Sequence, residues 1–74
     1  MNTRLEKFDS GWVALSLALG EVEIDVLIRR LEELKSGELK HFHIRNDDFS
    51  LDEGVSDIEI SIAGKGEQNN MMIE

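Results

Sequence analysis

The sequence predicts an α+β fold, in which one helix packs on one face of a small antiparallel or mixed sheet. Two observations lead to this prediction. Apolar residues alternate with polar or small ones in separate segments, as they do in half-buried strands, and one segment between them has helical periodicity. The expected element order is β(β)αββ, in two layers with about three to five strands. We expect a single domain over residues 1–66, followed by a polar tail or short edge strand over residues 67–74.

The first elements are two strand-like segments joined by a turn. Thr3 to Phe8 is a candidate short strand. Asp9-Ser10-Gly11 predicts a turn, because Asp and Ser side chains bond locally and Gly tolerates positive φ. From residue 12 to 19 the chain alternates, with one apolar face and one face of small residues beside Trp12. The apolar face consists of Val13, Leu15, Leu17 and Leu19, and the other of Trp12, Ala14, Ser16 and Ala18.

A helix is expected from Glu21 to Ser36. Acidic residues occupy its first turns and Lys35 its last turn, as the helix dipole favours, and Gly37 follows as a C-terminal cap. Its apolar residues recur at i, i+3 and i+4 and form one stripe, which we expect to face the sheet. This stripe consists of Ile24, Leu27, Ile28, Leu31 and Leu34, and Val22 and Val26 fall on the far side.

Two further strands are expected after the helix. Phe42 and Ile44 alternate with polar residues, and Ile58, Ile60 and Ile62 do the same. Between them lies an acidic, polar loop over residues 46–56, which we expect Leu51 and Val55 to pin. The sheet face away from the helix would then be uncovered, and it would carry Trp12, Ala14, Ser16, Ala18, His41, His43, Arg45, Glu59 and Ser61.

Composition restricts the classes of partner. The net charge is −8, from 16 acidic and 8 basic side chains. Phosphate contacts need clusters of Lys and Arg, so this charge disfavours nucleic acid and anionic membranes. A basic protein partner is the complementary choice, although the charge also serves solubility. There is no cysteine, no signal-peptide-like start and no apolar run near the ~20 residues of a membrane helix, so we expect a cytoplasmic protein.

The segment "KHFHIRNDD" raises the question of a metal site. His41 and His43 at i, i+2 on a strand point to the same side, about 6–7 Å apart. Asp47, Asp48 or Glu59 would be the third ligand that a zinc site usually needs. We favour the plainer interpretation, in which the histidines and Arg45 form the polar side of a strand and pair with Glu59 and Asp57. We therefore expect no cofactor and no metal ligand, with metal binding as an alternative.

Other sites of chemistry are poorly supported. A calcium loop starting at Asp48 would need glycine where Glu53 stands, one residue before Gly54. Cysteine and tyrosine are absent, and no serine lies in a nucleophile elbow. No helix follows Gly64-Lys65-Gly66, so this segment is not a phosphate-binding loop. We expect a protein that is not an enzyme and has no catalytic residue.

The helix and the segments after it resemble a known group of proteins. The succession "LIRRLEELKSG", "HFHI", "LDEG" and "SDIEISI" resembles small immunity proteins of bacterial toxin systems, in particular the immunity protein 32 family, over about residues 12–63. Val55 separates Gly54 from Ser56, which departs from the Gly-Ser pair of that family. The matching positions are His41, His43, Leu51, Gly54, Ser56, Ile58 and Ile60.

This resemblance implies a protein that neutralises a cognate toxin by binding it, and toxic nucleases are often basic. The leading hypothesis is therefore an acidic, protein-binding domain that is not an enzyme. Its alternatives are a homodimeric structural domain and a small metal-binding protein that uses the His-x-His strand. The predicted contact residues are Trp12, His41, His43, Asp47, Asp48, Asp52 and Glu53.

Overall fold

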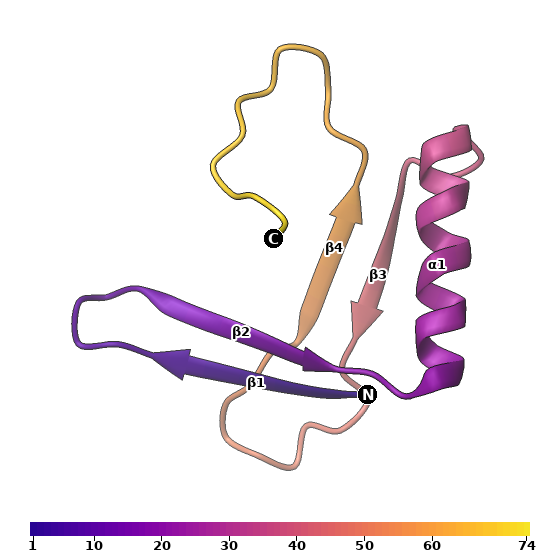
Figure 1. Ribbon diagram of the computed structural model, residues 1–74. Coiled ribbons are helices and arrows are strands. Elements are labelled where there is room, and N and C mark those ends of the chain that lie inside the picture. The colour runs from indigo at the N-terminus through magenta and orange to yellow at the C-terminus, as the bar shows by residue number, and fades with distance from the viewer.

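The computed structural model describes residues 1–74 and confirms an α+β fold with the predicted element order. Four strands form two antiparallel pairs, and one helix lies alongside the second pair (Figure 1). No ladder joins the two pairs, so each hairpin is a sheet of its own. The elements are β1 (Asn2–Lys7), β2 (Val13–Ala18), α1 (Glu21–Ser36), β3 (His41–Arg45) and β4 (Asp57–Ser61).

The β1–β2 hairpin closes through a short turn. The N–H of Phe8 donates to the carbonyl of Trp12 (2.9 Å), and the N–H of Gly11 donates to the carbonyl of Phe8 (3.1 Å). Gly11 has a φ of 93°, in the left-handed region that favours glycine. The register places Leu5 opposite Leu15. Because paired residues share a face, one side of this hairpin is apolar, with Leu5, Val13, Leu15 and Leu17.

Helix α1 begins and ends as the sequence predicts. The N–H of Gly20 donates to the Glu23 carboxylate (2.9 Å), which is one half of a capping box. At the other end Gly37 has a φ of 87°, and its N–H donates to the carbonyl of Leu34 (3.2 Å). Such a left-handed glycine satisfies one of the carbonyls that the helix end leaves free.

The β3–β4 hairpin has one apolar and one polar face. Phe42 pairs with Ile60 and Ile44 pairs with Ile58, and these four side chains are half-buried. A hollow of about 410 Å³ lies between α1 and β3, and Leu27, Phe42 and Ile44 are among its lining residues. The apolar face of this hairpin is therefore the one that the helix partly covers.

The core is very small, and part of the predicted packing is wrong. Only Leu34 is buried, at 6% exposure. Of the predicted helical stripe, Leu27 and Leu34 are covered, whereas Ile24, Ile28 and Leu31 are exposed. Val22 and Val26, predicted to face away from the core, are exposed (75% and 41%) and lie at the hollow next to β3. The physical reason is that α1 meets a single two-stranded hairpin, which is too narrow to cover the whole stripe.

The chain is also extended for its length. Its radius of gyration is 14.4 Å, whereas a compact domain of this length has about 11 Å. The β1–β2 hairpin projects away from α1 and the β3–β4 hairpin (Figure 1). Residues 62–74 form no helix or strand, and Met71, Met72 and Ile73 are exposed.

Candidate functional site

The acidic loop between β3 and β4, residues 46–56, is organised by one side chain. The N–H of Asn46 donates to the carbonyl of Ser56 (2.9 Å), and its side-chain amide donates to the carbonyl of Val55 (2.9 Å). Its side-chain oxygen accepts from the N–H of Asp48 (2.8 Å). Asn46 thereby joins both ends of the loop, as asparagine often does in turns.

Asp48 continues this organisation. Its carboxylate accepts a hydrogen bond from the N–H of Ser50 (3.0 Å). Hydrogen bonding to the Ser50 side chain, and then to the Ser50 backbone, lowers the pKa of Asp48 below its ordinary value, because both bonds favour the charged form. These bonds favour the negative form of the carboxylate and also shape the loop.

The remaining acidic side chains of the loop have different partners. Glu53 forms an ion pair with Lys7 of β1 (3.0 Å), which connects the loop to the first hairpin. Asp47 and Asp52 form no hydrogen bond or ion pair with other side chains, so their charges are free to meet a partner. The loop carries these four acidic side chains and no basic one.

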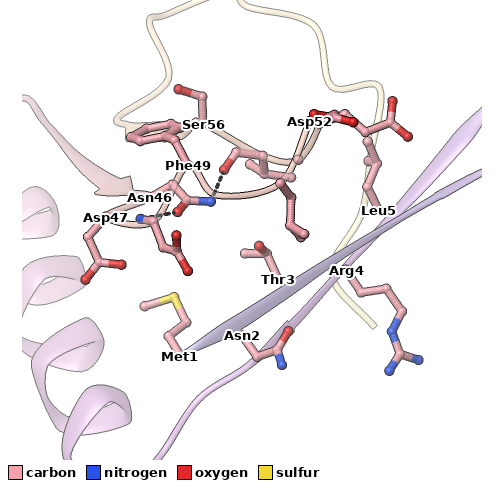
Figure 2. Close-up of a pocket in the computed structure, with 15 residues that line it drawn as sticks. Met1, Asn2, Thr3, Arg4, Leu5, Asn46, Asp47, Phe49, Asp52 and Ser56 are labelled. Carbon is pink, nitrogen blue, oxygen red and sulfur yellow. Dashed lines mark hydrogen bonds between the residues drawn. The ribbon is translucent and has the colours of Figure 1, made fainter.

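A groove of about 890 Å³ separates the acidic loop from β1 (Figure 2). Acidic residues of the loop line it on one side, and Arg4 and Leu5 of β1 line it on the other. Phe49 and Leu51 also line the groove, and they are 70% and 81% exposed. The prediction that Leu51 pins the loop is therefore wrong, because Asn46 and the half-buried Val55 hold it instead.

Phe49 and Leu51 were not among the predicted contact residues. The sequence did contain a signal for them, because a large apolar side chain among four carboxylates has little of its own loop to pack against. An apolar centre with a charged rim is typical of protein-binding surfaces. Phe49 and Leu51 line one groove together with the predicted Asp47, Asp48, Asp52 and Glu53.

The predicted histidines lie on a second surface, the polar face of the β3–β4 hairpin. His43 lies opposite Glu59, and Arg45 lies opposite Asp57. The predicted cross-strand pairing is confirmed: His43 Nδ1 lies 3.0 Å from Asp57 Oδ2, and His43 Nε2 lies 3.7 Å from Glu59 Oε1. His41 also belongs here, because its ring centroid is 5.3 Å from that of His43.

Trp12 lies on neither surface. It is in the turn just before β2 and is 78% exposed. The sequence pattern predicts that Trp12, His41 and His43 share one sheet face. This placement is wrong, because the two hairpins form separate sheets and Trp12 precedes its strand.

Comparisons with known proteins identify no family for this chain. No protein-family model, no curated protein and no solved structure matches the chain. The resemblance to immunity proteins stays a prediction. No helix in the structure has both the length and the apolar character needed to cross a membrane.

Proposed function

We propose that this chain is a protein-binding domain without catalytic activity, and that it works by covering part of a basic partner protein. The supporting observation is its surface area. The chain exposes 7095 Å², whereas a compact monomer of its mass exposes about 4,600 Å². The excess of roughly 2,500 Å² exceeds the ~800 Å² that each partner contributes to a standard interface. A surface of this size is better explained by association than by a free monomer.

Much of this surface is apolar. The exposed tail, residues 62–74, accounts for part of the excess. Another part is the apolar face of the β1–β2 hairpin, where Leu5, Val13, Leu15 and Leu17 are all exposed. A two-stranded hairpin with an uncovered apolar face is marginally stable in water by itself. A partner that covers this face stabilises the hairpin, so we expect binding and ordering of this region to be coupled.

Charge argues for the kind of partner. Residues 41–61 carry six acidic side chains and one basic side chain, so the negative charge is concentrated on the acidic loop and the β3–β4 hairpin. A positively charged surface opposite the loop would associate faster, because opposite potentials steer the encounter. Phe49 and Leu51 would provide apolar contact at the centre of the same groove. This combination favours a basic protein over a neutral one.

Neutralisation of a toxin is the specific form of this function that we propose. It rests on the resemblance to immunity proteins and on the complementarity between an acidic inhibitor and a basic toxic enzyme. Such an inhibitor needs no catalytic group of its own, because it acts by occupying the partner's surface. The groove residues and the β1–β2 apolar face would then form the contact.

Charge reversal in the loop tests this proposal. Affinity capture from native-source lysate, eluted in a salt gradient, supplies the partner for kinetic measurements. Asp47→Lys with Asp52→Lys reverses two charges that hold no hydrogen bond in the loop. We expect the association rate to fall about tenfold and its salt dependence to weaken, because steering is lost.

The matched control is Glu38→Lys with Glu74→Lys. It changes the net charge by the same amount outside the groove, and neither side chain forms an ion pair with another residue. We expect this control to retain most of the association rate. Equal rates for all three proteins would contradict binding through the loop, and failure to capture any basic protein would contradict the choice of partner.

A homodimer is the second candidate, and the exposed helical residues favour it. Ile24, Ile28 and Leu31 on α1 are open, as is the apolar face of the β1–β2 hairpin. The hairpin of one copy could cover the helix of another, which is a low-cost route to a dimer. Light scattering of the purified chain separates the two candidates: a stable dimer at micromolar concentration favours this one, and a mass near 8.4 kDa favours a different partner protein.

A further inference from the structure

Three side chains that commonly bind metal converge on the polar face of the β3–β4 hairpin. His41 and His43 project from β3, and Glu59 lies opposite His43 on β4. One nitrogen or oxygen atom from each side chain lies within 4.8 Å of the other two. Two imidazoles and a carboxylate make the three-ligand set found in many zinc sites that keep one coordination position open.

A second observation comes from Asp57. Both of its carboxylate oxygens lie 3.0 Å from Nδ1 of His43, so this nitrogen is the one that donates its proton. In the neutral ring the lone pair is then on Nε2, on the side of Glu59. In metal sites, the histidine nitrogen that does not bind the metal usually donates a hydrogen bond to a group such as a carboxylate. This bond fixes the tautomer and the orientation of the imidazole. Arg45 in turn contacts Asp57, with Nε 3.5 Å from Oδ1.

The spacing between the two facing groups also fits a cation. His43 Nε2 and Glu59 Oε1 are 3.7 Å apart, which is too long for a good hydrogen bond. In a tetrahedral zinc site, ligand atoms at 2.0–2.2 Å from the metal lie about 3.4 Å from each other. A divalent cation between this lone pair and this carboxylate would be attracted to both. His41, whose ring meets His43 edge-on at 88°, is placed to provide the third ligand.

We propose that His41, His43 and Glu59 bind one divalent transition-metal ion of the zinc class, and that Asp57 positions His43 for it. Imidazole and carboxylate ligands without thiolate suit Zn²⁺, Ni²⁺ or Cu²⁺ better than Mg²⁺ or Ca²⁺. The metal would connect β3 to β4 on the polar face of the hairpin. It would therefore stabilise the hairpin, and its open position would be available to water or to a side chain of a partner. This site does not depend on the proposed protein-binding function.

Titration of the metal-free chain with zinc chloride tests the site. Calorimetry measures affinity and stoichiometry, and nitrogen-15 NMR follows the imidazole nitrogens of His41 and His43. We expect one equivalent to bind and to move the signals of both rings. Unmoved imidazole signals, or binding by the acidic loop instead, would overturn the proposal.

Variants separate the ligands from the positioning residue. His41→Ala and Glu59→Gln should each abolish the one-equivalent transition. Asp57→Asn keeps all three ligands and should weaken zinc affinity about 10- to 100-fold. It should also move the His43 tautomer away from Nδ1–H, a change that a merely structural role would not produce. Asp57→Glu should recover part of the affinity.

The matched control is Asp47→Asn, which removes one carboxylate from the neighbouring acidic loop. We expect it to leave zinc affinity unchanged. Affinity that falls with Asp47→Asn and persists in His41→Ala would show that zinc binds the loop, which contradicts the site. Far-ultraviolet circular dichroism verifies that each variant retains the fold of the parent chain.

Discussion

The two β-hairpins have similar patterns but different surroundings. Both are antiparallel pairs with one apolar and one polar or small-residue face. In the β3–β4 hairpin the apolar face is half-buried beside α1, whereas in the β1–β2 hairpin it is exposed. Alternation therefore shows which side of a hairpin is apolar, but it does not show what covers that side. The β3–β4 hairpin has its cover within the chain, whereas the apolar face of the β1–β2 hairpin stays exposed.

The largest expected effect comes from truncating one leucine in each region. Leu34→Ala removes the only buried side chain and should lower the free energy of unfolding by about 2–3 kcal/mol. Leu15→Ala, on the exposed face of the β1–β2 hairpin, should cost less than about 1 kcal/mol in the free chain, because little contact is lost there. Urea unfolding followed by circular dichroism measures both.

Leu15→Ala should have a larger effect in a complex with a partner protein than in the free chain. Once a partner covers the β1–β2 face, Leu15→Ala should weaken binding by about 1–2 kcal/mol. Equal destabilisation by the two variants in the free chain would contradict the difference between the region around α1 and the β1–β2 hairpin.

A medium effect is expected at the loop that connects β3 to β4. Asn46→Ala removes a hydrogen bond to the carbonyl of Val55 and another from the N–H of Asp48. We expect a loss of about 1–2 kcal/mol and faster proteolysis within residues 46–56. Limited proteolysis with mass spectrometry identifies the cleaved bonds. Asn69→Ala, in the tail, is the control, and equal cleavage rates would show that Asn46 does not organise the loop.

The smallest expected effect concerns acid pH at the start of α1. The hydrogen bond from the amino group of Met1, and then that from the N–H of Gly20, lowers the pKa of Glu23 below 4.5. Because the folded pKa is the lower one, this contribution to stability is complete above about pH 4.5. It is lost as the pH falls through the folded pKa.

Helix content measured as a function of pH tests this contribution of Glu23 to stability. The wild-type chain should lose helicity in the acid range, and Glu23→Gln should show a smaller loss. Glu21→Gln is the control, since Glu21 also lies in the first turn but accepts no side-chain hydrogen bond at the cap. Identical curves for all three proteins would remove Glu23 from the account.

Local features of the fold were predictable from the sequence. Alternation, the helical stripe and the glycine at position 37 predicted the elements, because each depends on neighbouring residues. The facing of His43 and Glu59 was also predictable, because polar residues alternate in both strands. These features need no knowledge of how distant segments pack.

Features that depend on distant packing were not predictable. Nothing in the alternation of residues 12–19 distinguishes a strand of a shared sheet from one in a separate hairpin. The position of Val22 and Val26 at the hollow beside β3 depends on how α1 lies against a narrow hairpin. Asp57 was expected as a cross-strand partner. Its hydrogen bond with Nδ1 of His43 depends on side-chain geometry, which the spacing of residues in the sequence does not define.

The proposed binding function depends most on the open form of the free chain, and one measurement tests whether the chain has this form. Small-angle X-ray scattering, coupled to size exclusion and light scattering, gives the size and mass of the same particle. We expect an 8.4 kDa monomer with a radius of gyration near 14.4 Å. A monomer with about 11 Å, the value of a compact domain of this length, would contradict it. Such a chain would have folded its apolar faces onto itself and would have no excess surface for a partner to cover.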